Sequence, residues 1–247
     1  MSKVAIVTGG ARGIGRGCAH ALAEKGFDIA LVDLLVPEME RTAGEIRAMG
    51  RRASVHQADV AEFARAAAIV AAVAAEWGRI DFLLNNAGKS MPKPMLEISE
   101  EEFDRTIAIN LKSCFNYIHA VAPIMKRQGA GRIVSMSSLN AYTGGVTSAV
   151  SKFAYAAAKA GILGMTRALA KELGPEIAIN AICPGVIKTE LGNSLTQARE
   201  PELKKGIALG RLGSPADVGQ LVAFLATVEP NFMTGQDFKI DGFQWVI

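Results

Sequence analysis

Cysteine is scarce in this sequence, and the few cysteines stand far apart. The three are Cys18, Cys114 and Cys183, and none has a partner at the spacing of a metal site. An odd number of separated cysteines is typical of reduced thiols in a cytosolic protein and argues against a disulfide framework. We therefore expect three small core side chains, no metal site and a cytoplasmic location.

Long apolar runs are also missing. The longest strongly apolar stretch, residues 66–75, is bounded by Arg65 and Glu76 and is too short to span a bilayer. The first residues run into the apolar residues 4–7 and then into glycines, without the long apolar region or cleavage site of a signal peptide. The sequence therefore predicts no membrane segment and a strand at its start.

Charge of one sign does not accumulate either. Lysine and arginine number 27 against 24 aspartates and glutamates, and the basic residues are scattered along the chain. Proteins that bind nucleic acid usually gather their basic residues into a patch or stripe. The charge pattern thus gives little support for a nucleic-acid partner.

What the sequence does contain is a regular alternation of short apolar runs and longer segments of helical period. The apolar runs, which are typical of parallel strands buried on both faces, are residues 4–7, 29–32, 53–56, 82–84, 133–136 and 177–182. Helices are predicted over about 14–25, 37–49, 61–77, 100–128, 152–173 and 215–227. We find no tandem repeat or linker. The alternation predicts an α/β fold, a single-domain doubly wound parallel sheet with helices on both faces.

A glycine-rich segment, Thr8 to Gly15, joins the first predicted strand to the first predicted helix. Glycines let the backbone turn tightly and approach a pyrophosphate, whose charge the free N–H groups at a helix N-terminus can meet. A lone glycine cluster is a weak signal. Asp33 strengthens it, because a dinucleotide site carries an acidic residue about twenty positions further on, at the end of the second strand. The segment therefore predicts dinucleotide binding.

Asp33 also bears on which dinucleotide is bound. Its carboxylate can accept hydrogen bonds from the adenosine ribose hydroxyls, but it would repel the 2′-phosphate of NADP. Arg12 argues the other way, since a guanidinium in the glycine loop could pair with that phosphate. No cation immediately follows Asp33. We predict NAD(H) as the cofactor, with NADP as the less favoured alternative.

One of the three tyrosines, Tyr155, is followed four residues later by a cation, Lys159. On a helix the two side chains lie on one face, so the ammonium can stabilise the phenolate. A phenol has a reference pKa of about 10, and acid–base work near neutrality requires that value to fall by roughly 3 units. Taken alone the pair is ambiguous, because a packed tyrosine beside an extended lysine has the same spacing.

Further motifs follow in a fixed order. They are Asp59-Val60, Asn85-Asn86-Ala87-Gly88, Asn110, Ser138, Tyr155 with Lys159, and Pro184-Gly185-Val186-Ile187-Lys188-Thr189. With this set, from Lys3 to about Gly242, the chain resembles the short-chain dehydrogenases/reductases. The resemblance implies a Rossmann fold of about seven parallel strands, an oxidoreductase activity and a homotetramer.

The resemblance also implies catalytic roles. Tyr155 would be the general acid or base, and Lys159 would lower its pKa and bind the nicotinamide ribose. Ser138 would hold the substrate oxygen, although Ser137 is an alternative on the opposite face of the strand. Asn110 would hold a water that relays protons, unless its side chain only bonds backbone within its own helix.

The cofactor is implied to contact the glycine loop, the ends of the strands and the motif after the sixth strand. The implied residues are Gly9, Arg12, Gly13, Ile14, Gly15, Asp33, Asp59, Val60, Asn86, Ala87, Gly88, Tyr155, Lys159, Pro184, Gly185, Ile187 and Thr189. Of these, Thr189 and the backbone of Ile187 would clamp the nicotinamide carboxamide.

Three segments depart from the regular pattern or from the family. The spacing from Ser138 to Tyr155 is longer than is common in the family, which predicts a longer loop over the substrate. Residues 188–213 are polar and weakly periodic, and they follow a strand end, so we predict a mobile substrate lid; an ordinary surface loop with a short helix is the alternative. The helix over 152–173 carries alanine and glycine on several faces, which predicts close packing on another subunit.

The substrate has no readable code. We predict a small-molecule secondary alcohol and its ketone, with a polyol, a sugar or a hydroxy acid favoured. The alternative is a 3-oxoacyl-thioester reductase, which would usually prefer NADPH. A catalytically silent NAD(H)-binding protein is a third hypothesis, and it predicts loss of the serine, tyrosine or lysine, all of which are present.

Overall fold

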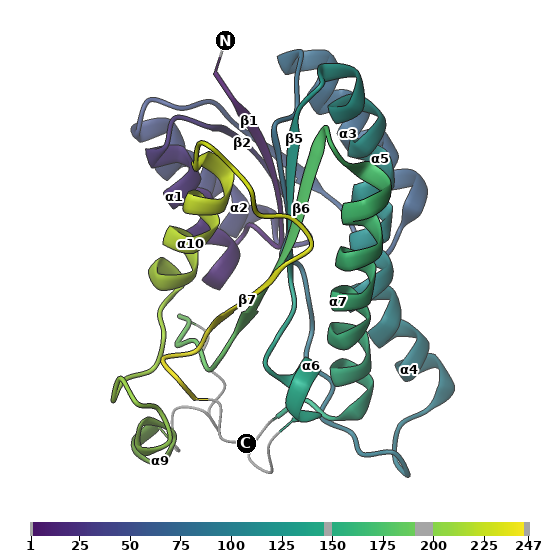
Figure 1. Ribbon diagram of the computed structural model, residues 1–247, viewed down its shortest axis with the longest axis vertical. Coiled ribbons are helices and arrows are strands. Elements are labelled where there is room, and N and C mark those ends of the chain that lie inside the picture. The colour runs from purple at the N-terminus through teal and green to yellow at the C-terminus, as the bar shows by residue number, and fades with distance from the viewer. Residues whose placement is uncertain (1, 146–149, 191–199, 245–247) are drawn as a thin grey trace.

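The computed structural model describes residues 2–145, 150–190 and 200–244 and contains a seven-stranded, all-parallel sheet. The strands are ordered β3-β2-β1-β4-β5-β6-β7 (Figure 1). Their bounds are β1 Val4–Thr8, β2 Asp28–Asp33, β3 Ala53–Gln57, β4 Phe82–Asn85, β5 Gly131–Met136, β6 Ile177–Pro184 and β7 Asp237–Ile240. The order reverses between β1 and β4, so the predicted doubly wound α/β fold is confirmed.

Helices cover both faces of the sheet (Figure 1). They are α1 Gly13–Glu24, α2 Val36–Ala48, α3 Phe63–Trp77, α4 Glu100–Ile107, the π-helical segment η1 Ala108–Lys112, α5 Ser113–Gln128, α6 Asn140–Thr143, α7 Phe153–Leu173, α9 Glu200–Lys205 and α10 Pro215–Thr227. Two apolar clusters of buried residues separate the layers. One packs α1, α2 and α10 on the sheet, and the other packs α3, α5 and α7 on its opposite face.

The structure differs from the sequence-based expectation in three elements. The helix predicted over residues 100–128 is interrupted by the π-helical segment η1. The strand predicted over 53–56 is only half-buried, because β3 lies at an edge of the sheet. The seventh strand, β7, has no continuous apolar run and was expected only from the family resemblance. Apolar periodicity therefore identifies the central strands better than the edge strands.

The parallel pairing brings the carboxyl ends of five strands to one edge of the sheet. Thr8 pairs with Val32, one residue before Asp33, while Asn85 pairs with Ser135 and Met136 pairs with Ile182. In an open α/β sheet this edge is where ligands bind, at the point where the strand order reverses. The predicted motifs follow these strand ends, so the fold gathers them in one region.

The predictions for the cysteines and for α7 have different outcomes. All three cysteines are buried free thiols, as expected, and burial raises the pKa of Cys18 to about 12. Among the small residues of α7, Ala156 is buried, whereas Ala157 and Gly164 are exposed. The subunit contact along α7 stays a prediction. Within the described residues no helix has the length and apolar character needed to cross a membrane.

Candidate active site

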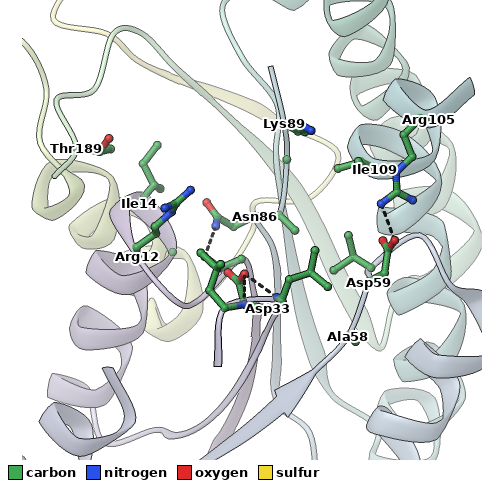
Figure 2. A pocket seen from close by; sticks show the side chains of 17 residues that line it. Arg12, Ile14, Asp33, Ala58, Asp59, Asn86, Lys89, Arg105, Ile109 and Thr189 are labelled. Atoms are coloured by element: carbon green, nitrogen blue, oxygen red, sulfur yellow. Dashed lines mark hydrogen bonds and ion pairs between the residues drawn. The ribbon is translucent and has the colours of Figure 1, made fainter. Parts of the chain in front are cut away.

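A cavity of about 500 Å³ opens at the carboxyl edge of the sheet (Figure 2). Its lining comes from the segments that follow β1, β2, β3 and β4, together with α4, η1 and the segment after β6. The lining residues are Gly9, Arg12, Ile14, Gly15, Asp33, Leu34, Leu35, Ala58, Asp59, Val60, Asn86, Ala87, Gly88, Lys89, Arg105, Ile109 and Thr189. Most of the predicted cofactor residues are in this set. Gly13, Tyr155, Lys159, Pro184, Gly185 and Ile187 are not.

Two glycines allow the backbone segments beside the cavity to pack closely. Gly9 has a φ of +65°, and a Cβ placed there would lie 2.8 Å from the Cα of Ala87. A Cβ on Gly15 would lie 1.9 Å from the carbonyl oxygen of Gly9. No side chain can be accommodated at either position without displacing backbone. The start of α1 therefore presents its N–H groups directly to the cavity.

Thr8 and Asn86 fasten the glycine loop to the end of β4. The Asn86 side-chain amide donates to the carbonyls of Thr8 and Gly9, both at 3.1 Å. In return, the Thr8 hydroxyl accepts the backbone N–H groups of Asn86 at 3.0 Å and Ala87 at 3.1 Å. These four bonds fix the glycine loop relative to the residues Asn86, Ala87 and Gly88 on the other wall of the cavity.

Asp33 lies at the end of β2 with its carboxylate held by backbone donors. One oxygen accepts the N–H of Ala11 at 3.2 Å, and the other accepts the N–H groups of Leu34 at 2.7 Å and Leu35 at 3.3 Å. Arg12 lines the same cavity, and its side chain forms no ion pair within the described part of the chain. A fixed carboxylate and an unpaired guanidinium thus share this end of the cavity.

The other end of the cavity carries an ion pair between Asp59 and Arg105, at 2.5 Å (Figure 2). Burial disfavours the charged form of Asp59, but hydrogen bonds from the Ala61 N–H and from Arg105 outweigh it and lower the pKa of the carboxyl. Asp59 is therefore ionised and locally neutralised at physiological pH. It contributes a hydrogen-bonded wall to the cavity without adding an unpaired charge.

Lys159 and Tyr155 meet on one face of α7, as the spacing predicts. Lys159 is buried, its ammonium donates to the Met136 carbonyl at 2.7 Å, and it lies 5.5 Å from the centroid of the Tyr155 ring. Tyr155 is half-buried. A buried ammonium that keeps one backbone acceptor retains further donors for a ligand. The pair therefore combines a fixed positive charge with an accessible phenol.

Asn110 lies in the π-helical segment and reaches two parts of the chain. Its side-chain amide donates to the carbonyl of Thr106 at 3.0 Å and to that of Lys89 at 2.9 Å, while its oxygen accepts the Lys89 N–H at 3.1 Å. It thus bonds backbone in its own helix and also holds the loop after Gly88. A Cβ on Gly88 would lie 2.9 Å from the Asn110 oxygen and 3.5 Å from the Lys159 ammonium, so all three groups converge.

The two candidate serines have different surroundings. Ser137 is buried, and its hydroxyl donates to the Lys159 carbonyl at 2.8 Å, which ties β5 to α7. Ser138 is half-buried, and its hydroxyl accepts the Asn140 N–H at 3.2 Å but donates to no group among the described residues. The arrangement favours Ser138 over Ser137 as the group that reaches a substrate.

Comparisons with known proteins agree with this geometry. A family model described as enoyl-(acyl carrier protein) reductase matches residues 9–242. The oxidoreductase UcpA of Salmonella typhimurium is 40% identical over 249 residues, which cover 97% of this chain and 93% of the relative. The chain belongs to the short-chain dehydrogenase/reductase family. Members of this family are oxidoreductases that act on CH–OH groups with NAD(P).

Two further relatives show what activities occur among proteins similar to this short-chain dehydrogenase/reductase. The 3-oxoacyl-[acyl-carrier-protein] reductase FabG of Staphylococcus aureus is 36% identical over 244 residues, covering 98% of both chains. A crystal structure of a single-residue variant of actinorhodin polyketide ketoreductase with NADPH superposes with a TM-score of 0.90 at 29% identity, covering 98% of this chain and 96% of the other. Both relatives are named as reductases.

The segment after β6 in this short-chain dehydrogenase/reductase is held mainly by backbone bonds. Gly185 donates to the Ile240 carbonyl at 3.0 Å, and Ile187 forms a parallel bridge with Gly213. Only Thr189 of the predicted carboxamide clamp lines the cavity.

Of the predicted lid, residues 191–199 lie outside the described chain, as do residues 146–149 of the long loop before Tyr155. Lys188 forms an ion pair with Glu200 at 2.9 Å, so its charge is directed along the segment.

Sequence reasoning missed six residues that line the cavity. They are Leu34, Leu35, Ala58, Lys89, Arg105 and Ile109. Leu34, Leu35 and Lys89 directly follow motifs that had been singled out, so adjacency was an available signal. Arg105 and Ile109 come from a helical region far from the glycine loop in sequence, and no local pattern marks them.

Proposed function

We propose that the protein is an NAD(H)-dependent oxidoreductase that interconverts a secondary alcohol and a ketone. The observation that carries this proposal is the buried Lys159 ammonium beside the half-buried Tyr155 phenol. In general, a cation beside a phenol stabilises the phenolate form. Such a phenol can take or give a proton at a substrate oxygen near neutral pH.

The residues around the cavity fit a dinucleotide. Gly9, Ile14 and Gly15 line the cavity at the start of α1, where backbone N–H groups can meet the charge of a pyrophosphate. Asp33 stands where it can accept bonds from ribose hydroxyls, and its negative charge disfavours a 2′-phosphate. These features support NAD(H), which when bound would supply the hydride acceptor or donor at its nicotinamide ring.

The chain's own groups would then handle the proton and the substrate. In the oxidation direction Tyr155 removes the hydroxyl proton of the alcohol, and in the reduction direction it returns a proton to the ketone oxygen. Ser138 donates a hydrogen bond to the same oxygen and stabilises the charge that develops there. Lys159 keeps its ammonium 5.5 Å from the centroid of the Tyr155 ring, and Asn110 holds the loop at Gly88 and Lys89 beside Lys159.

A 3-oxoacyl-thioester reductase is the second candidate. It is favoured by the similarity to the FabG reductase and by Arg12, whose guanidinium lines the cavity, has no ion pair among the described residues and could pair with a 2′-phosphate. This candidate requires NADPH to be the better reductant. The two proposals therefore differ in a quantity that can be measured before the natural substrate is known.

A substrate panel tests the proposal directly. We expect NADH formation with at least one member of a set of polyols, sugars and hydroxy acids, and a higher kcat/KM with NAD than with NADP. Oxidation of NADPH by 3-oxoacyl thioesters, without activity on the alcohols, would replace the first proposal with the second. Cofactor binding without turnover on either set would favour a catalytically silent protein.

Substitutions of the two serines separate a catalytic role from a structural one. Ser138→Ala is expected to lower kcat by about 10²-fold or more, because it removes a hydrogen bond to the developing oxyanion. Ser137→Ala is expected to lower the free energy of unfolding by about 1 kcal/mol, since it removes the buried hydrogen bond that ties β5 to the Lys159 carbonyl of α7. Steady-state kinetics and urea unfolding measure the two effects. Equal losses of kcat in both variants would contradict the assignment.

A further inference from the structure

Thr189 is flanked by two charged residues that are paired with different parts of the fold. Lys188, on one side, forms its ion pair with Glu200 of α9. Glu190, on the other side, forms an ion pair with Arg16 of α1, the helix that starts at the glycine loop. Since α1 and the segment after β6 are separated by more than half of the chain, the Glu190–Arg16 pair is a long-range contact across the end of the cavity.

Arg16 is held in place by Glu45, independently of its contact with Glu190. Its Nε and Nη2 atoms donate to the two carboxylate oxygens of Glu45, at 2.9 and 2.6 Å, and only 17% of its side chain is exposed. Donation of these hydrogen bonds to Glu45 raises the pKa of Arg16 and lowers the pKa of Glu45, so both groups are charged. A guanidinium held in this two-pronged geometry has already lost its rotational freedom, which strengthens its third contact.

Among the described residues, two further contacts bear on the position of Thr189. The Lys188 N–H donates to the Gly213 carbonyl at 2.8 Å, which sets the backbone one residue before Thr189. On the far side, a Cβ placed on Gly13 would lie 3.3 Å from the γ-methyl group of Thr189. Thr189 therefore packs against the glycine loop. Glu190, which directly follows it, can hold it there through the ion pair with Arg16.

We infer that the Glu190–Arg16 pair is a positioning contact that keeps Thr189 against the glycine loop, and so preserves the cofactor-binding form of the cavity. This inference rests on the proposed use of NAD(H). Arg16 and Glu190 are positioning residues here, because neither lines the cavity. Glu190 is largely exposed, so its contribution is limited to that of a surface pair with one pre-organised partner.

The direction in which Glu190→Gln changes the affinity for the cofactor distinguishes a positioning role from a purely electrostatic one. Glu190 carries a negative charge near a cavity that is proposed to bind an anionic dinucleotide. If the charge alone mattered, Glu190→Gln would strengthen cofactor binding, because it removes a repulsion and frees Arg16 to attract the phosphates. If the pair positions Thr189, the same substitution weakens binding.

A binding titration with NADH, monitored by the fluorescence of NADH, tests the inference without a substrate. Glu190→Gln is expected to raise the Kd for NADH by about two- to fivefold, the range that an exposed ion pair can supply. Glu24→Gln is the matched control, because Glu24 lines the same surface hollow as Glu190 and Arg16 but forms no ion pair among the described residues. Its Kd is expected to equal that of the wild type.

A second measurement needs no cofactor. Hydrogen exchange at the Lys188 amide is expected to be faster in Glu190→Gln than in the wild type or in Glu24→Gln, because the segment loses the ion pair that joins it to α1. Tighter NADH binding by Glu190→Gln, or unchanged binding with unchanged exchange, would overturn the inference. Failure of the wild type to bind NADH would reject the proposed function instead, and the exchange experiment would still decide whether the pair holds the segment.

Discussion

Replacing Tyr155 by phenylalanine is expected to lower kcat by about 10²- to 10⁴-fold, the range of a lost general acid or base. The substitution removes the ionisable hydroxyl and keeps the ring that lies 5.5 Å from the Lys159 ammonium. Lys159 also keeps its bond to the Met136 carbonyl, so the surroundings of position 155 are not expected to rearrange. The Kd for NADH should therefore stay within about twofold of the wild-type value.

Tyr117→Phe is the matched control for this prediction. Tyr117 lies on α5 and is fully buried in the apolar cluster on that face of the sheet. Its hydroxyl has no hydrogen-bond partner among the described residues. Its removal is expected to leave kcat unchanged. Steady-state rates for both variants, measured on any substrate found in the panel, decide the matter. Substantial residual activity in Tyr155→Phe would assign proton transfer to another group.

The central part of the fold and the ends of its strands could be predicted because their signals are local. A strand buried on both faces reads as an apolar run, and a residue at its end, such as Asp33, necessarily lies at the carboxyl edge of a parallel sheet. The spacing of Tyr155 and Lys159 needs only the helical period to place both side chains on one face. Each of these inferences uses a short run of consecutive residues or the order of the strands.

The remaining features depend on contacts between distant residues. The π-helical segment at Asn110 has no apolar period of its own, and it is accompanied by bonds from the Asn110 side chain to Thr106 and to Lys89 on a separate loop. The Asp59–Arg105 pair and the Arg16–Glu190 pair likewise join separate segments. Local propensity carries no information on which charged side chains meet after folding, so these partners emerge only from the structure.

Replacing Asp33 by asparagine is expected to raise the ratio of kcat/KM for NADP to that for NAD by about 10- to 100-fold, or roughly 1.4–2.8 kcal/mol. The substitution removes the negative charge that would repel a 2′-phosphate and keeps Arg12, which has no ion pair in the part of the chain that the structure describes, in the same cavity. It also weakens the acceptor for ribose hydroxyls, so the efficiency with NAD should fall while that with NADP rises. Kinetics with both cofactors, at saturating substrate, measure the ratio.

Asp59→Asn separates this specific effect from a general change in the charge of the cavity. Asp59 lines the opposite end and is already neutralised by Arg105, so its substitution removes the same formal charge without changing the surroundings of Asp33. The preference between the two cofactors should not change, even if the affinity for both decreases. Asparagine at position 33 keeps one acceptor oxygen, which can serve the N–H groups of Leu34 and Leu35, but it loses the bond from the Ala11 N–H, so urea unfolding of this variant should show a modest loss of stability. An equal shift in preference in both variants would show that total charge, and not the carboxylate at the end of β2, selects the cofactor.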